Sequence, residues 1–292
     1  FADGLIRSLT VVEGSFLASG QTGWLSGGRA GTIEPAMWTS RDGEQWTRQD
    51  SPVAGGVTTA GPRGVVAAVR APDVVDMYLK PPGVDWQLVQ TVDDAGSALD
   101  LEAGDEGFVY FTAGRRADGE PEPLVLASSD GREWYAAEPG ALPAEARDIA
   151  PLGGDWVAAT GQTDPDATCP ENEPVLSIWR GSSGLEWASV SEIGDPLRRD
   201  GFGLPSAFES AGGHLFLSVQ RLVIENTAPH PMGVWHSTDA VTWELLRLGP
   251  DAEVNAVYDA RGDGDDDAAC CLLVGGRTGD RASPAMIWRF AP

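Results

Sequence analysis

The chain has 292 residues, of which 42% are hydrophobic, and a formal net charge of −24. This hydrophobic content is enough for a packed core and excludes a disordered chain, and no apolar run approaches the roughly 20 residues of a membrane-spanning helix. An acidic surface of this kind repels phosphate backbones and anionic lipids, so we expect neither nucleic-acid binding nor direct membrane insertion. Lysine occurs once, beside many arginines, alanines and glycines, which is typical of GC-rich bacterial genomes.

The three cysteines are Cys169, Cys270 and Cys271. Three are too few for a disulfide scaffold, and they lack the Cys-x-x-Cys spacing of zinc sites. The adjacent pair is either a vicinal disulfide of an exported protein or two thiols at the start of a buried strand. No basic-then-apolar leader is present, so a signal peptide is expected to be removed or absent. We expect a secreted or cell-surface protein, or a lipoprotein anchored by a segment outside this chain.

Six segments of the chain share one order of predicted strands. Each begins with a short run of alternating character, at residues 9–12, 57–60, 99–102, 148–152, 207–210 and 256–258. A glycine-containing turn follows in most of them, as in Glu13-Gly14 and Gly153-Gly154, which is typical of a hairpin. Next comes a nearly continuous apolar run, at 16–18, 65–69, 108–111, 156–159, 215–217 and 272–274, which indicates a strand buried on both faces.

A long polar loop then leads to a third predicted strand, which carries an aromatic or aliphatic pair at 37–38, 77–78, 125–126, 178–179, 234–235 and 287–288. In the best copies a Ser-x-Asp-Gly turn follows, and a final Trp opens the fourth strand. The resulting units span approximately 5–50, 53–92, 97–140, 146–190, 204–248 and 254–292. Self-similarity at about 40–55 residues predicts an array of supersecondary units.

Four antiparallel strands per unit, about six units and no amphipathic helix predict an all-β fold, a β-propeller in one domain over residues 1–292. A two-sheet sandwich is the alternative, but it does not need the same Trp at the same offset in every unit. The sixth unit reaches Pro292 before its fourth strand. We expect this blade either to be incomplete or to be closed by the N-terminal segment, which has an Asp3-Gly4 pair.

The Ser-x-Asp-Gly turn with its following Trp resembles the Asp-box, or bacterial neuraminidase repeat, of sialidases, sortilin-like receptors and many bacterial propellers. The resemblance covers the whole chain as a pattern, with degenerate copies. In this motif the carboxylate accepts bonds from its own turn, Gly permits a positive φ, and Trp packs on a neighbouring blade. We interpret the matching residues as structural: Ser40, Asp42, Gly43, Trp46, Ser128, Asp130, Gly131, Trp134, Trp187, Ser237, Asp239 and Trp243.

A sialidase, as the resemblance implies it, needs three arginines, a Tyr–Glu nucleophile pair and an acidic Asp. The nearest match to its first arginine phrase is Ile6-Arg7-Ser8, which lacks the aromatic residue and the Pro. Tyr78, Tyr110 and Tyr135 fall at structural positions of their units, and Tyr258 alone is placed where it could reach a central channel. No catalytic residues are therefore assigned, and the sequence favours a protein that is not an enzyme without deciding the question.

We assign no cofactor and no metal. The acidic run at 263–267 lacks the Gly and Glu of an EF-hand and is interpreted as an exposed hairpin turn. His214, His230 and His236 are widely spaced and have no Glu-x-x-His relation. Walker and Gly-x-Ser-x-Gly phrases do not occur.

The loops that leave the second strands are the most distinctive feature outside the predicted core. By strand order they share one rim, which carries aromatic and cationic residues in an acidic protein: Trp24, Arg29, Arg115, Arg116, Arg221 and Arg277. Loops on a rigid scaffold commonly carry binding specificity. The leading hypothesis is an exported, non-catalytic propeller that binds a protein or glycan through this rim. The alternatives are a sialidase-like hydrolase or lyase acting in the central channel, and an assembly scaffold; the oligomeric state is left open.

Overall fold

The computed structural model describes residues 4–23, 33–72, 74–93, 97–115, 121–143, 146–161, 175–194, 202–222, 232–249, 252–259, 272–278 and 285–290. The regular elements in these ranges are all β-strands, and they form five four-stranded sheets and one three-stranded sheet. All strand pairs are antiparallel and join neighbours in the chain, as the repeat pattern predicted. Among the described residues there is no helix with the length and hydropathy to span a membrane. The three cysteines lie outside the described residues.

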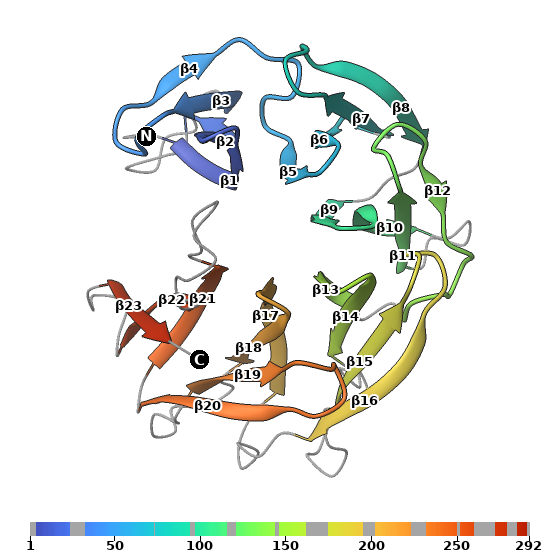
Figure 1. Cartoon of the computed structure of the whole chain (residues 1–292), viewed down its shortest axis with the longest axis vertical. Coiled ribbons are helices and arrows are strands. Elements are labelled where there is room, and N and C mark those ends of the chain that lie inside the picture. The colour runs from blue at the N-terminus through green and yellow to red at the C-terminus, as the bar shows by residue number, and fades with distance from the viewer. Residues whose placement is uncertain are drawn as a thin grey trace. The chain divides into compact units, whose positions relative to one another are not determined.

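The chain divides into two compact units, Phe1–Ala144 with Ser183–Leu185, and Glu145–Ser182 with Glu186–Pro292. The prediction of one domain over residues 1–292 stays a prediction. Unit 1 contains three sheets in chain order (Figure 1), with strands β1 (Gly4–Val12), β2 (Ser15–Thr22), β3 (Glu34–Ser40), β4 (Thr47–Gln49), β5 (Val57–Gly61), β6 (Gly64–Arg70), β7 (Val74–Lys80), β8 (Gln87–Asp93), β9 (Ser97–Gly104), β10 (Gly107–Arg115), β11 (Pro121–Ser128) and β12 (Tyr135–Ala136).

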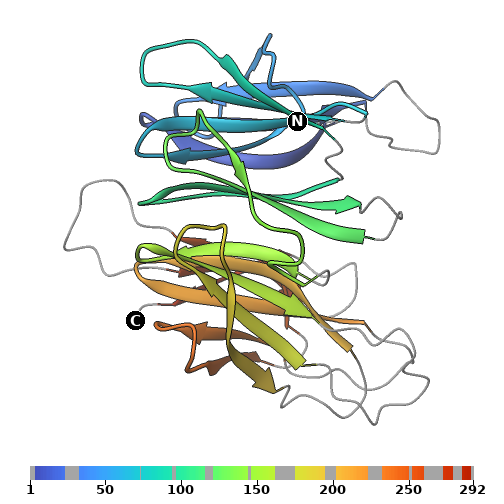
Figure 2. The ribbon, with the colours of Figure 1, turned by 90° about the vertical axis from the view of Figure 1, so that its right-hand side faces the viewer.

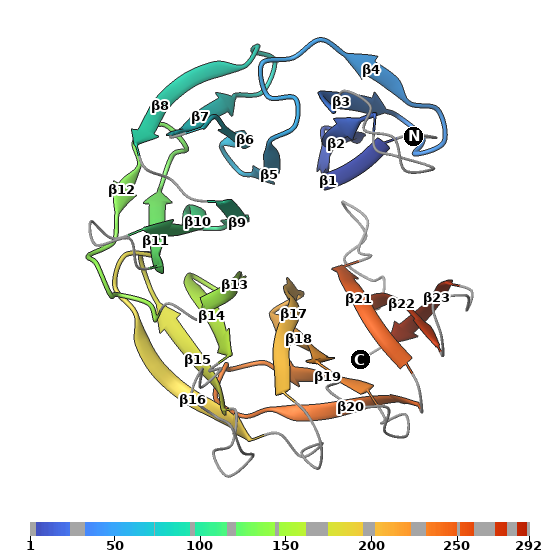
Figure 3. The same ribbon diagram turned by 180° about the vertical axis from the view of Figure 1, so that it is seen from behind.

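Unit 2 contains the other three sheets, which Figure 3 shows from behind, and its last sheet has three strands within the described residues. Its strands are β13 (Ala146–Leu152), β14 (Asp155–Gly161), β15 (Val175–Gly181), β16 (Ala188–Gly194), β17 (Phe202–Ala211), β18 (His214–Leu222), β19 (Met232–Ser237), β20 (Glu244–Gly249), β21 (Ala252–Asp259), β22 (Leu272–Thr278) and β23 (Ala285–Phe290).

The second strands form the core because their side chains are apolar on both faces. In β6 the residues from Val65 to Ala68 are all buried, and in β10 the run from Phe108 to Phe111 is buried as well. One face of each sheet then packs against the next sheet. A single cluster joins Val66 and Met77 of the second sheet to Phe108 and Tyr110 of the third. In unit 2 a similar cluster joins Ile178 of the fourth sheet to Leu215 of the fifth.

Hydrogen bonds between first strands hold neighbouring sheets in register. In unit 1, Thr10 Oγ1 of β1 donates to the Thr58 carbonyl of β5 at 2.9 Å. In unit 2, the Phe208 N–H of β17 donates to Asp148 Oδ2 of β13 at 2.8 Å. The first strands of consecutive sheets therefore lie side by side within each unit. Figure 2 shows the strands of unit 1, in blue and green, from the side.

The N-terminal residues belong to the first sheet. Gly4 and Leu5 extend β1 and pair with Thr22 and Gln21 of β2. These two residues therefore do not form the outer strand of the sixth sheet, which corrects that part of the closure expected from the Asp3-Gly4 pair. The reason is register: β2 is long enough to pair with the whole of β1, because its apolar centre is extended by Gly20, Gln21 and Thr22.

Candidate functional site

Three of the six residues predicted for the ligand-binding rim lie at the ends of second strands. Trp24, Arg29 and Arg116 lie outside the described residues. Arg115 is the last residue of β10, and Arg221 and Arg277 lie near the ends of β18 and β22. The structure describes the backbone but not the side chains of these three arginines, so the rim stays a prediction.

The turn between β3 and β4 is closed by its own serine and aspartate. Asp42 Oδ1 accepts hydrogen bonds from the backbone N–H groups of Glu44 at 2.9 Å and Gln45 at 2.8 Å, and from Ser40 Oγ at 3.0 Å. Ser40 Oγ in turn accepts the Gly43 N–H at 2.9 Å. Gly43 has a φ of +74°, a conformation that a glycine adopts without the steric cost of a Cβ.

The same bonds recur in two other turns. In the turn after β11, Asp130 Oδ1 accepts the N–H groups of Arg132 at 2.8 Å and Glu133 at 3.2 Å. In the turn after β19, Asp239 Oδ1 accepts those of Val241 at 2.8 Å and Thr242 at 2.7 Å. We call these three turns, residues 40–46, 128–134 and 237–243, the Ser-Asp hairpins.

The turn after β15 departs from this pattern. Gly181 stands at the serine position, and a Cβ built there would lie 2.4 Å from the Glu186 carbonyl oxygen. Ser183 Oγ replaces the carboxylate and accepts the Leu185 N–H at 3.2 Å. Gly184 keeps the positive φ, at +72°. The degenerate sequence of this copy therefore follows from a closer approach of the backbone at residue 181.

The hairpin carboxylates are poor candidates for catalytic acids. Backbone N–H groups of Thr242 and Val241 lower the pKa of Asp239 to about 2. Hydrogen bonds from Gln45 and Glu44 lower the pKa of Asp42 in the same way. Because such bonds stabilise the charged form, these groups stay ionised at neutral pH. An acid that must donate a proton needs the opposite shift.

Each Ser-Asp hairpin ends in a tryptophan that packs on a phenylalanine of its own sheet. Ring centroids are 6.3 Å apart for Phe16–Trp46, 6.4 Å for Phe108–Trp134 and 6.3 Å for Phe208–Trp243. The indole N–H donates back to the turn, as from Trp46 Nε1 to the Gly43 carbonyl at 2.9 Å. The phenylalanine belongs to the second strand in the first and third sheets and to the first strand, β17, in the fifth sheet.

Two of the hairpins are also held by the last strand of the preceding sheet. Gln90 of β8 accepts the Trp134 N–H at 3.0 Å and donates to the Trp134 carbonyl at 3.3 Å. Ser191 Oγ of β16 donates to the Ala240 carbonyl at 2.7 Å and accepts the Trp243 indole N–H at 3.3 Å. Trp46 instead packs with Ala18, Ala36 and Trp38 of its own sheet.

The tyrosines offer no activated nucleophile among the described side chains. Burial raises the pKa of Tyr110 to about 12. Burial, followed by the charge of Asp76, raises that of Tyr78, and a hydrogen bond to Glu133 raises that of Tyr135. The Tyr258 side chain lies outside the described residues. Arg7 is exposed, at an irregularity in the pairing of β1 with β2.

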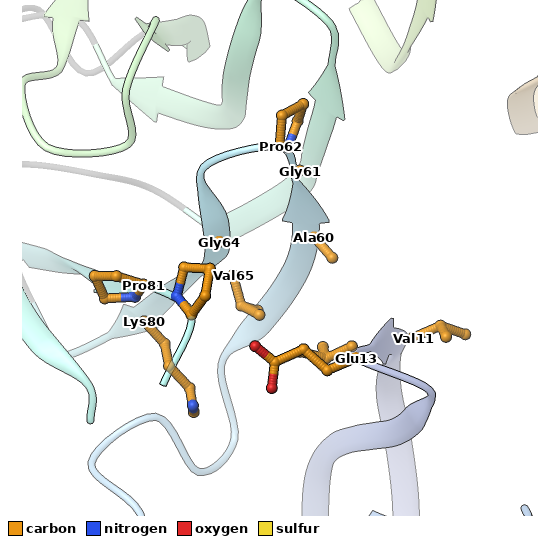
Figure 4. Close-up of a pocket in the computed structure, with 11 residues that line it drawn as sticks. Val11, Glu13, Ala60, Gly61, Pro62, Gly64, Val65, Lys80 and Pro81 are labelled. Atoms are coloured by element: carbon orange, nitrogen blue, oxygen red, sulfur yellow. The ribbon is translucent and has the colours of Figure 1, made fainter. Parts of the chain in front are cut away.

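A cavity of about 190 Å³ lies between the first two sheets (Figure 4), at the ends of the strands where they turn. Its apolar wall comes from valines and prolines of the β1–β2, β5–β6 and β7–β8 turns: Val11, Val12, Pro62, Val65, Pro81 and Pro82. Glu13 and Lys80 add one charge of each sign, and Lys80, the chain's one lysine, donates to the Val84 carbonyl at 3.2 Å. The cavity is large enough for one aliphatic side chain between two charged groups.

The fifth sheet brings two histidines together. His214 Nδ1 and His236 Nε2 lie 2.7 Å apart, although 22 residues separate them in sequence. The sequence analysis missed this pair because it compared spacings along the chain. The signal that could have found it is the hairpin: a strand beginning at His214 and a partner strand ending near Ser237 place both rings on one face. The acidic run at 263–267 and His230 lie outside the described residues.

Comparison with known proteins identifies the architecture. The β-propeller domain of the trilobed protease from Pyrococcus furiosus superposes with a TM-score of 0.51 at 6% identity, over 99% of this chain and 97% of that chain. The α-L-arabinofuranosidase Arb93A from Fusarium graminearum gives 0.51 at 12% identity, over 99% and 93%. The Trypanosoma rangeli sialidase gives 0.52 at 11% identity, over 98% of this chain and 54% of its own.

The chain is a β-propeller. Its all-β sheets, arranged as successive antiparallel blades, confirm the predicted fold class. At these identities the similarity establishes the fold alone. No protein-family model matches the chain, and no curated protein matches it. The propellers to which it is similar include two glycoside hydrolases and a propeller domain of a protease, so the fold by itself does not select a function.

Proposed function

We propose that this propeller is a non-catalytic, exported binding protein that recognises a protein or glycan ligand through the rim of loops after its second strands. The observation that carries the proposal is that the repeated carboxylates are engaged by their own turns. Asp42, Asp130 and Asp239 each accept two backbone N–H groups. This engagement supports the interpretation of the Ser-Asp hairpins as degenerate Asp-boxes with a structural role, which leaves binding to the loops.

The rim is suited to binding because of its charge. The protein carries −24, yet Arg115 and Arg277 lie at the ends of second strands and Arg116 comes next in the sequence. Guanidinium groups pair with carboxylates and stack on planar groups, and a tryptophan such as Trp24 offers a face to sugars or aliphatic side chains.

A binding screen tests this proposal. Immobilised protein is presented with cell-wall and host glycans and with extracellular protein fractions, and the hit is measured again with a variant carrying Arg115→Glu, Arg116→Glu and Arg277→Glu. The matched control carries Arg41→Glu, Arg63→Glu and Arg132→Glu, three exposed arginines in turns of unit 1. Loss of the hit in the first variant alone supports the rim, and equal binding by both variants contradicts it.

The cavity between the first two sheets serves as a second control. It lies at the β1–β2, β5–β6 and β7–β8 turns, at the opposite ends of the strands from the rim. A ligand held by the rim should therefore bind equally well to a variant with the cavity charges exchanged, Glu13→Lys and Lys80→Glu. Loss of the hit in this variant would place the contact at the cavity and contradict the rim.

The second candidate function is glycoside hydrolysis, since the same fold occurs in an arabinofuranosidase and a sialidase. Such an activity needs a pair of carboxyl groups with separated pKa values around the scissile bond. A panel of fluorogenic arabinosides and sialosides measures it directly. Turnover that survives purification to a single species and disappears on heat denaturation would replace the binding proposal with this one.

A further inference from the structure

The histidine pair of the fifth sheet lies on a face with an unusual row of residues. In the pairing of β17, β18, β19 and β20, Glu209 is opposite Phe216, Phe216 is opposite His236, and His236 is opposite Glu244. Residues that are directly opposite in neighbouring strands point to the same face of a sheet. His214 precedes Phe216 by two residues and therefore shares that face.

The opposite face of these strands forms the core. Leu215, Leu217 and Trp235 alternate with the histidine face and belong to the cluster that packs against the fourth sheet. The two histidines are only half-buried, so they are accessible from water. The rings are inclined by 21° with centroids 5.0 Å apart, and the ring of Phe216 lies 5.1 Å from that of His236. The two imidazole rings thus lie edge to edge, next to the ring of Phe216.

We propose that His214 and His236 together bind one divalent transition-metal ion of the class that prefers imidazole, Zn²⁺ or Cu²⁺. Both ions take neutral imidazole nitrogens as ligands. Zn–N bonds of about 2.0–2.1 Å in a tetrahedral site place two ligand nitrogens roughly 3.3 Å apart. The present separation of 2.7 Å is that of a hydrogen bond, so a small rotation of the two rings replaces the shared proton by the ion.

The surroundings favour a cation at this position. Glu244 is opposite His236 in the neighbouring strand, and its charge acts on that imidazole. Among the described residues no group of three or more potential ligands is in place to hold a metal ion. Within the described part of the chain the proposed ligands are the two imidazoles, with water at the remaining positions and Glu244 as a nearby charge.

Calorimetric titration with ZnCl₂ at neutral pH tests the proposal. The wild-type chain should bind one ion, and His214→Gln and His236→Gln should each weaken binding by at least about 10–100-fold, the range seen when only an outer-shell partner of a metal ligand is lost. His230→Gln, which removes the third histidine of the chain, is the matched control and should bind like the wild type. Glu244→Gln should weaken binding less than either histidine variant.

A titration with Mg²⁺ distinguishes binding at the histidine pair from general attraction of cations to an acidic surface, because Mg²⁺ prefers oxygen ligands. A titration with MgCl₂ should be the same for all variants. The proposal is overturned if the wild type shows no saturable Zn²⁺ binding, or if His236→Gln binds Zn²⁺ as the wild type does. Should a variant fail to fold, the electron paramagnetic resonance spectrum of Cu²⁺ on the wild type decides: coupling to two imidazole nitrogens supports the pair, and coupling to none contradicts it.

Discussion

At the scale of single residues, the Ser-Asp hairpins show how one backbone conformation accepts different side chains. Gly43 and Gly131 both have a φ of +74°, and Ala240 holds the equivalent position with a φ of +62°. A left-handed conformation costs an L-residue about 1–2 kcal/mol. The Ala240 methyl group is fully buried in the core cluster of the fourth and fifth sheets, which offsets part of that cost.

The two glycines should therefore differ in their tolerance of alanine. Gly43→Ala should lower the free energy of unfolding by about 1–2 kcal/mol through its φ alone, because the new Cβ meets Phe16 at an ordinary 3.5 Å. Gly131→Ala should lower it further, since its Cβ meets Val66 at 3.0 Å and Leu79 at 3.1 Å. Urea denaturation of both variants measures the difference. Equal losses would show that crowding at residue 131 is relieved without cost.

Acid should act on the histidine pair before it acts on the hairpins. The pKa of His236 in the folded protein lies below its ordinary 6.5, chiefly through burial. The unfolded chain therefore binds the proton more readily, and the free energy of unfolding should fall as the pH drops below about 6.5. The change is measured by Tm between neutral pH and pH about 5 in wild type, His236→Gln and His230→Gln. The first variant should lose most of this pH dependence and the second should keep it.

The hairpin carboxylates act in a lower pH range. The folded-state pKa of Asp239 is about 2, below its ordinary 3.8, so the stability it contributes is present above pH 3.8 and is lost as the pH falls from there toward 2. Asp239→Asn should reduce the fall in Tm across this range. If Asp239→Asn unfolds in acid with the same dependence of Tm on pH as the wild type, other carboxylates cause the acid sensitivity.

At the scale of elements, the outer strands of the second and fourth sheets each couple to the next sheet through one side chain. Gln90 makes two bonds to the Trp134 peptide, and Ser191 makes the corresponding contacts to the next hairpin in unit 2. Gln90→Ala should lower the free energy of unfolding by about 1–3 kcal/mol, because the part-buried Trp134 N–H loses its acceptor. Gln87→Ala, an exposed position of the same strand, should change it by no more than about 0.5 kcal/mol. Chemical denaturation compares the two; similar values for both would mean that water replaces the lost bonds.

The elements were the part of the structure most accessible from sequence. The run Val65–Val69 could be recognised as a buried strand because it lacks in–out alternation, and the repeated Asp-Gly phrase located the turn after β3 and β11. The histidine pair was not found in this way, since it depends on the register in which β18 pairs with β19. The Gln90 contact was hidden for a similar reason: it joins side chain to backbone between two sheets and leaves no pattern in either strand.

At the scale of the whole molecule, charge opposes folding. The chain carries −24, and the described residues contain few ion pairs, such as Arg48 with Glu34 and Arg180 with Asp155. The folded state gathers these negative charges into a smaller volume than the unfolded chain does. Added NaCl shortens the Debye length from about 30 Å at 0.01 M to about 3 Å at 1 M. Tm should therefore rise with NaCl, and KCl should give the same result; a Tm that is constant or falls would show that screened repulsion is not a significant cost.

The closure of the Ser-Asp hairpins has a consequence for the order of folding. The hydrogen bonds that each aspartate accepts come from residues at most three positions away in the sequence, whereas Gln90 and Trp134 are 44 positions apart. Closing a short loop costs little entropy, and local contacts form early. A nascent chain can therefore form each of these turns as it is synthesised, before the strand that later contacts the turn has folded. The turns then act as local nucleation sites for the blades.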